Sequence, residues 1–253
     1  MRELVGDSLV ILRRNLQRFR RQPEMLAGYT IQPIMFVLLF VYVFGGSIQT
    51  GMDYEDFLIP GIVVQNITFG GALTAVGLVD DLNKGLIDRF RSLPMARSAV
   101  LSGRTLADLT RNVFVMFLMV AIGYLVGFRV QTGLLGLLAG MAVMLFFGFS
   151  LTWIFAIIGL STTNAETAQA ASFPILAPLV FASSAFVVVA TMPGWLQGFA
   201  KYQPLSVAID ATRSLMLGGF YSNPGKVIAS IAWSLGIIAV FAPLAVRKYR
   251  RAA

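Results

Sequence analysis

Long apolar runs constrain this chain more than any other feature. Most of them are long enough to cross roughly 30 Å of hydrocarbon as helices, and they lack the period-two alternation of a transmembrane barrel. Only 13% of the 253 residues are charged, which is about half the share usual in a soluble domain. The sequence therefore predicts an all-α integral membrane protein that forms one domain over residues 1–253. The six predicted spans are 27–48, 57–79, 107–128, 134–160, 168–190 and 227–246.

The segment before the first span, residues 1–26, is predicted to lie in the membrane interface. Apolar residues recur at steps of three and four from Val5 to Phe19, and arginines fill much of the other face, as in an interfacial amphipathic helix. Pro23 is expected to end this helix. The apolar run that follows is too long for a cleavable signal, and no small-residue cleavage site follows it.

The distribution of Lys and Arg predicts the orientation. Sixteen of the 20 lie in the N-terminal segment, in residues 80–112 and in the C-terminal tail, and four lie in the alternate segments. Because basic residues favour the cytoplasmic side, both termini and the 80–112 loop are predicted to be cytoplasmic in a multi-pass plasma-membrane protein. The net charge is +8. Because the basic residues flank apolar runs, this charge indicates contact with anionic lipid and not with nucleic acid.

Missing residue types exclude several chemistries. The chain has neither Cys nor His, which removes thiol nucleophiles, disulfides and the commonest metal ligands. The spans carry no acidic or basic residue between their ends, and Asp108 and Arg111 are expected to snorkel from the start of the third span. This pattern argues against an ion-driven secondary carrier and against an intramembrane enzyme.

No nucleotide-binding motif is present either. Gly225-Lys226 is followed by Val, and the upstream glycine of a phosphate-binding loop is missing. We therefore expect no catalytic residue, metal or cofactor on this chain. An ATP-driven pump built on it needs a separate ATPase subunit that carries ATP and Mg²⁺.

Several polar residues lie inside the predicted spans, and two interpretations remain open. They either form hydrogen bonds between helices or line a mildly polar path for an amphiphile. Pro174 and Pro178, one turn apart in the fifth span, are likewise either flex points or packing residues. The residues assigned to a possible substrate path are Gln65, Asn66, Thr68, Gln169 and Ser172.

The charged stretch between the second and third spans, residues 80–106, predicts a short amphipathic helix. Leu82, Leu86, Phe90 and Leu93 recur at steps of four, four and three, which places them on one helical face. Pro94 is expected to end the helix. The helix is either a solvated loop on lipid headgroups or a lever that a soluble partner pushes.

The segment 191–226, between the last two spans, is predicted to lie on the outer side. Pro204 is expected to open a short helix in which Asp210 and Arg213 pair one turn apart. Gly218-Gly219 is expected to end that helix. An outer gate formed by Pro204, Asp210 and Arg213 and a passive loop are both compatible with the pattern.

Two stretches carry a family resemblance. The run from Lys84 to Met95, KGLIDRFRSLPM, with Arg97 to Leu101 and Gly103-Arg104, resembles the cytoplasmic signature of type-2 ABC transporter permeases. The run from Tyr202 to Arg213, YQPLSVAIDATR, resembles the second signature of that family. Within the family, both are similar to the drug-export permeases of the daunorubicin/doxorubicin-resistance type.

The resemblance implies a six-helix permease with an N-terminal interface helix, a cytoplasmic coupling helix and outer half-helices before the sixth span. It also implies a pair of permease chains bound to two ATPase subunits. Many relatives have a glutamate-rich lead into the coupling glycine, whereas this chain has Asn83-Lys84. The residues that the resemblance assigns to ATPase coupling are Gly85, Leu86, Ile87, Asp88, Arg89, Phe90 and Arg91.

The leading functional interpretation is the membrane subunit of an ATP-driven exporter of amphiphilic drugs or lipids. Export of a polysaccharide or a glycolipid is the alternative within the same class. A secondary carrier is the alternative from another class, and the missing charges within the spans oppose it.

Overall fold

The computed structural model describes residues 23–46, 48, 50–83 and 97–252. Within these ranges every regular element is a helix, so the predicted all-α class is confirmed for the described part of the chain. The elements are α2 (Pro23–Leu38), η1 (Leu39–Phe44), α3 (Tyr54–Asn83), α5 (Arg97–Val126), α6 (Gly133–Gly159), α7 (Ala165–Phe181), η2 (Val189–Thr191), α8 (Gly194–Tyr202), α9 (Pro204–Leu217), η3 (Gly219–Tyr221) and α10 (Pro224–Ala252).

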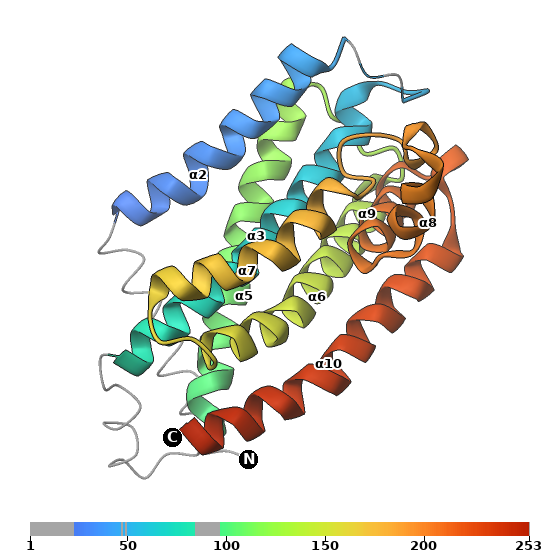
Figure 1. The fold of residues 1–253 in the computed structure, drawn as a ribbon. Helices are drawn as coiled ribbons and strands as arrows, with labels where there is room; N and C mark the ends of the chain where they lie inside the picture. Colours follow the sequence, from blue (N-terminus) through green and yellow to red (C-terminus); the bar gives the residue numbers. More distant parts are fainter. Residues whose placement is uncertain (1–22, 47, 49, 84–96, 253) are drawn as a thin grey trace.

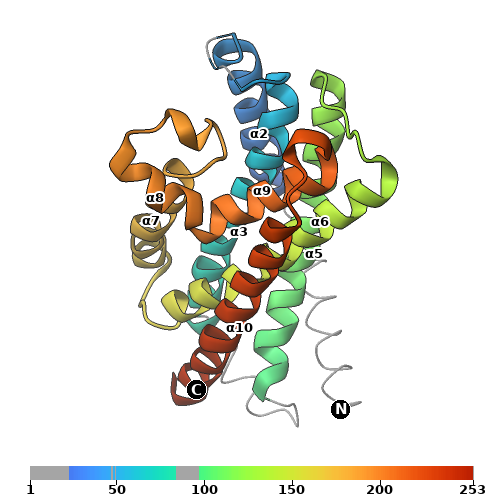
Figure 2. The ribbon, with the colours of Figure 1, turned by 90° about the vertical axis from the view of Figure 1, so that its right-hand side faces the viewer.

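Helix α3 is the centre of the bundle (Figures 1 and 2). It packs against α2, α5, α6, α7 and α9, and most of its residues between Tyr54 and Val79 are buried. Its apolar side chains form the main core with residues of α5, α6, α7 and α9. A helix that is apolar on all sides is expected to be enclosed by other helices. Helix α3 is enclosed in this way by the five helices around it.

Four of the described helices, α3, α5, α6 and α10, are long and apolar enough to cross a membrane. The parts of these helices that could cross it are Tyr54–Asn83, Asp108–Val126, Gly133–Gly159 and Pro224–Tyr249. They correspond to the second, third, fourth and sixth predicted spans. The first predicted span corresponds to α2 and η1, whose apolar part, Thr30–Phe44, is shorter. The predicted interfacial helix lies mostly in residues 1–22, outside the described residues.

The fifth apolar run is only partly helical. Helix α7 begins with a capping box, in which Asn164 and Thr167 bond each other's backbone, and it ends at Phe181, well before residue 190. After this point the Ser183 hydroxyl accepts from the Ala185 amide and donates to the Val180 carbonyl. The run stays apolar because the chain after the helix is itself buried. Apolar composition alone does not distinguish a buried loop from a helix.

The described elements divide into two ends. The C-terminal ends of α3 and α10 and the start of α5 lie at one end, and α8 and α9 lie at the other (Figures 1 and 2). We refer to the first as the inner end and to the second as the outer end, following the predicted orientation.

Candidate functional site

The outer helix α9 has the boundaries predicted from its sequence. Pro204 occupies the first turn, where its missing N–H costs no helical hydrogen bond. Gly218 ends the helix with a φ of 61°, a conformation that favours glycine. The Gln203 side-chain Nε2 donates to the carbonyls of Leu179 and Ala182 at 2.8 and 2.9 Å. The start of α9 is thereby tied to the C-terminal end of α7.

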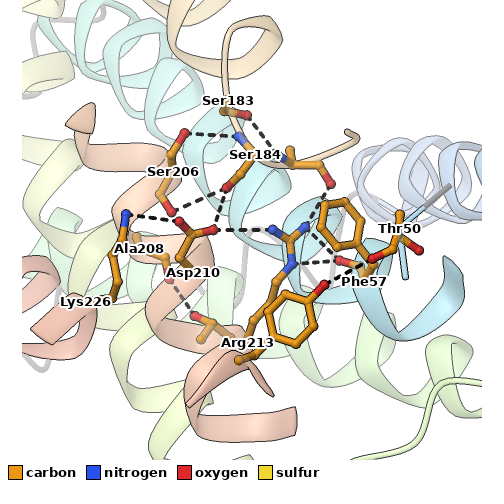
Figure 3. A network of polar contacts seen from close by, with 12 residues as sticks. Thr50, Phe57, Ser183, Ser184, Ser206, Ala208, Asp210, Arg213 and Lys226 are labelled. Carbon is orange, nitrogen blue, oxygen red and sulfur yellow. Dashed lines mark hydrogen bonds and ion pairs between the residues drawn. The ribbon is translucent and has the colours of Figure 1, made fainter. Parts of the chain in front are cut away.

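Arg213 on α9 is the most deeply buried charged residue at the outer end, with a relative exposure of 1%. Its Nε and Nη2 donate to the Phe57 carbonyl on α3 at 2.9 and 2.7 Å. Nη2 also donates to the Ala185 carbonyl, after α7, at 3.3 Å. The guanidinium carbon lies 3.6 Å from the centre of the Phe57 ring, within the range of a cation–π contact. One side chain therefore joins α3, α9 and the segment after α7 (Figure 3).

The Ala185 carbonyl can reach Arg213 because of a close approach at Gly61 on α3. A Cβ at Gly61 would lie 2.4 Å from the Ala185 oxygen, so a larger residue would push the segment after α7 away from α3. Glycine is the residue that permits such a contact between a helix and a second backbone.

Asp210 is the acidic partner of this group. Its carboxylate lies 3.5 Å from Arg213 Nη1 and 3.2 Å from Lys226 Nζ at the start of α10, and it accepts a 2.8 Å hydrogen bond from the Ser184 hydroxyl. The predicted pairing of Asp210 with Arg213 is present. Burial lowers the pKa of Arg213 to about 10, with the Asp210 charge opposing the shift, so the guanidinium remains protonated at neutral pH. We call Ser184, Asp210, Arg213 and Lys226, with the Phe57 and Ala185 carbonyls, the outer network.

The outer network borders a cavity of about 360 Å³. The side chains of Asp210 and Lys226 are 29% and 21% exposed, whereas that of Arg213 is 1% exposed. Apolar walls come from Phe57, Val188 and Val189. The Asp210–Lys226 contact is therefore the accessible part of the network, and the arginine is its enclosed part.

A second charged group lies between α3 and α5. Arg111 Nη1 is 3.5 Å from Asp108 Oδ1, and both side chains are 5% exposed. The Thr74 hydroxyl donates to Asp108 Oδ2 at 2.7 Å, and Arg111 Nη2 donates to the Gly70 carbonyl at 2.8 Å. We call Gly70, Thr74, Asp108 and Arg111 the inner cluster.

The inner cluster corrects two predictions from the sequence. Asp108 and Arg111 do not snorkel to an interface, because both are buried against α3. The second prediction was that no charged side chain lies between the ends of a span. Asp108 and Arg111 contact Thr74 and Gly70, which are inside the predicted second span. A charged residue at mid-membrane costs roughly 2.5–3.5 kcal/mol on insertion scales, but a neutral pair with hydrogen-bond partners offsets much of that cost. Hydropathy counts each charge separately and misses this compensation.

A glycine again permits the contact. A Cβ at Gly70 would lie 2.8 Å from the Asn112 side-chain oxygen and 3.0 Å from Arg111 Nη2. The next residue, Gly71, faces the Phe155 ring of α6 in the same way. The adjacent glycines let α5 and α6 approach α3 from two sides. The double glycine and the i, i+3 spacing of Asp108 and Arg111 were the available sequence signals for this cluster.

The residues predicted for a substrate path line neither the cavity beside the outer network nor the one around residues 41–55. They lie on α3 and α7, which pack side by side. Gln65 is buried, and its Oε1 has no hydrogen-bond partner among the described residues. Gln169 is exposed on α7. Asn66, Thr68 and Ser172 donate to carbonyls of their own helices at 3.0, 2.8 and 2.7 Å.

The residues predicted for ATPase coupling, Gly85 to Arg91, lie outside the described residues. Among the residues that the structure does describe, no group of three or more His, Cys, Asp and Glu side chains could hold a metal ion. Sequence reasoning also missed Ser184 and Lys226 in the outer network. The carbonyl acceptors of Phe57 and Ala185 have no side-chain signal that could reveal them.

A bundle of apolar helices, with short helices before α10, is the part of the arrangement implied by the family resemblance that the described residues contain. The chain matches the ABC-2 type transporter family over residues 8–217. It belongs to this family and is a multi-pass membrane protein.

Relatives within the family are named as permeases. The chain is 39% identical over 249 residues to the daunorubicin resistance ABC transporter permease protein DrrB1 of Streptomyces coeruleorubidus, covering 97% of this chain and 87% of that protein. It is 29% identical over 254 residues to the probable doxorubicin resistance ABC transporter permease protein DrrC of Mycobacterium tuberculosis, covering 99% and 91%. It is 26% identical over 232 residues to the putative transport permease ycf38 of Pyropia yezoensis, covering 88% and 78%.

Proposed function

We propose that this chain is the membrane permease subunit of an ATP-driven exporter that moves amphiphilic drugs, or lipid-like molecules, out of the cell. The observation that carries the proposal is the 39% identity to a daunorubicin resistance permease over 97% of the chain. Export of a polysaccharide or glycolipid remains the alternative within the family. A secondary carrier is disfavoured, because a permease of this family works with an external ATPase.

The proposed assembly contains a second permease chain and two ATPase subunits, in the plasma membrane. The proposed topology has six crossings: the four long helices, the α2–η1 segment and α7. Both termini lie in the cytoplasm. The distribution of basic residues supports this orientation. Reporter fusions at Ala253 and within residues 49–56 should give cytoplasmic and external signals respectively, and the reverse pattern would contradict the topology.

In this proposal the residues from Gly85 to Arg91 contact the ATPase subunit. An aromatic side chain buried in a groove of a partner is typically worth about 2–4 kcal/mol, whereas charges at the rim tune rate and specificity. Phe90→Ala should therefore weaken co-purification of the ATPase and abolish drug resistance while membrane insertion is retained. Arg89→Ala should have a milder effect that depends on salt. Retained binding and export in Phe90→Ala would contradict the assignment.

The outer network is proposed to be the outer gate, in a closed state. Its support is geometric: Arg213 joins three segments, and Lys226 adds α10 through Asp210. Opening would separate Lys226 from Asp210 first, because that contact borders the cavity and is the more exposed. Gln65, Asn66, Thr68, Gln169 and Ser172 are proposed to face the substrate on its way to this gate.

The function is tested with inside-out membrane vesicles that contain the chain and the ATPase subunit with which it co-purifies. We expect ATP-dependent accumulation of doxorubicin in the vesicles, lost when the ATPase subunit is omitted. The purified permease alone should hydrolyse no ATP. Accumulation driven by an ion gradient without ATP, or saturable ATP hydrolysis by the isolated chain, would contradict the proposal.

A further inference from the structure

The inner cluster is not explained by the outer gate or by a substrate path. Its groups come from two helices, and its contacts link them directly: Thr74 to Asp108 and Arg111 to the Gly70 carbonyl. Both charged side chains are 5% exposed, so the contacts are shielded from water. A hydrogen bond to a charged group in such surroundings is stronger than the same bond in solvent.

The cluster joins the inner halves of α3 and α5, two helices that follow one another in the chain. Helix α3 ends at Asn83 and α5 begins at Arg97, and the contacts hold Thr74 to Asp108. From Asn83 to Thr74 the helix rises by roughly 14 Å, and from Arg97 to Asp108 by roughly 16 Å. The two helices are thus fastened at similar distances from their inner ends.

Helix α3 also reaches the outer network. The Gly70 carbonyl accepts from Arg111, and the Phe57 carbonyl accepts from Arg213. These two carbonyls are separated by roughly 20 Å along the same helix. Helix α3 is continuous from Tyr54 to Asn83, with Pro60 inside it, so a displacement at Gly70 is carried along the same helix towards Phe57.

We propose that Asp108, Arg111 and Thr74 are positioning residues that fasten the inner halves of α3 and α5 into one unit, so that a displacement of these two helix halves reaches the outer network through α3. The contribution of this unit to transport rests on the proposed function. The fastening itself is a property of the chain alone. The two parts can therefore be tested separately.

The fastening is tested by spin labels at Leu73→Cys on α3 and Leu106→Cys on α5, both of which replace exposed residues. The chain has no native Cys, so only these positions carry label. In lipid nanodiscs the distance distribution should be narrow in the parent protein. It should broaden in Thr74→Val and more so in the double variant Asp108→Leu, Arg111→Met, which removes both charges of the pair together.

Thr152→Val is the matched control. Thr152 is also a buried threonine in a long helix, but its hydroxyl donates to the Phe149 carbonyl of its own helix. Its distance distribution should match that of the parent protein. Distributions in Thr74→Val and the double variant that are as narrow as in Thr152→Val would overturn the proposal.

The effect on transport is measured in the vesicles as doxorubicin accumulated per ATP hydrolysed. Substitutions along a coupling element change coupling by about 0.5–2 kcal/mol, so the ratio should fall roughly 2- to 30-fold in the double variant, with ATPase co-purification retained. An unchanged ratio beside a broadened distribution would overturn the coupling role. If the parent protein accumulates no doxorubicin, the proposed function fails, and the spin-label distances still decide whether the fastening exists.

Discussion

Two arginines donate to carbonyls of the same helix, but their surroundings differ. Arg111 binds the Gly70 carbonyl beside Asp108, and both charged side chains are enclosed between α3 and α5. Arg213 binds the Phe57 carbonyl, but its acid, Asp210, lies at a cavity and also contacts Lys226. The inner contact joins two helices, and its charged side chains are buried. The outer network joins four segments, and the side chains of Asp210 and Lys226 are partly exposed. The geometry suits a contact that persists at the inner end and a contact that can be released at the outer end.

The largest loss of stability is expected for Arg111→Met. The substitution removes the guanidinium that pairs with the buried Asp108 carboxylate, and removal of one member of a buried ion pair typically costs about 3–5 kcal/mol. The double variant Asp108→Leu, Arg111→Met should recover most of that loss. The measurement is the free energy of unfolding by SDS titration in mixed micelles. Equal losses in the single and the double variant would show that the charge pair is not the stabilising feature.

A smaller loss is expected for Arg213→Met at the outer end. Asp210 keeps Lys226 and Ser184 as partners and lies at a cavity, so no enclosed charge is left alone. The loss should be about 1–3 kcal/mol, from the carbonyls that no longer receive hydrogen bonds. Arg213→Lys keeps the charge but not the planar fork of donors, so it should fall between the parent and Arg213→Met. A loss larger than that of Arg111→Met would reverse the proposed difference between the two ends.

The sequence predicted the outer half of this comparison better than the inner half. Pro204 and Gly218 mark the ends of α9 by backbone rules that act locally, and the spacing of Asp210 and Arg213 predicted their pairing. The carbonyls that hold Arg213 come from residues far away in the chain, so no local rule identifies them. At the inner end, hydropathy placed Asp108 and Arg111 at an interface, because it does not recognise that opposite charges compensate each other.

The end of α7 shows the same limit in another form. Its apolar run continues past Phe181, but the chain turns, and the Ser183 hydroxyl bonds the Val180 carbonyl and the Ala185 amide. The turn is stabilised by its contacts with α3 and α9, which composition does not record. The residues from Gly85 to Arg91 remain a sequence-based prediction.

Asp210→Asn should change gating more than stability. The carboxylate is partly exposed, and ion pairs of this kind contribute about 0–1 kcal/mol. The amide can still accept from Ser184, but it attracts Lys226 less strongly. We expect near-parental unfolding together with increased ATP-independent leakage of doxorubicin across the vesicle membrane. Thr191→Val, whose exposed hydroxyl donates to the nearby Val188 carbonyl, is the control for local disturbance, and equal leakage in that variant would argue against a role for the carboxylate.

The smallest effect is expected for Lys226→Met. Its ammonium group contacts Asp210 at the edge of the cavity and is accessible to ions, so salt already screens the contact. Unfolding should change by less than about 0.5 kcal/mol. Leakage should increase slightly at low salt and match the parent at high salt. A loss that is independent of salt would place Lys226 in the enclosed part of the network.

The most direct test compares distances at the two ends of α3 in the complex with its ATPase subunit. Labels at Leu73→Cys and Leu106→Cys report on the inner end, and labels at Ala190→Cys and Ser222→Cys, which line the outer cavity, report on the outer end. Each pair is measured by pulsed electron spin resonance without nucleotide and after trapping with ATP and vanadate. We predict that the outer distance changes on trapping and the inner distance does not. An inner distance that changes as much as the outer one would contradict the account.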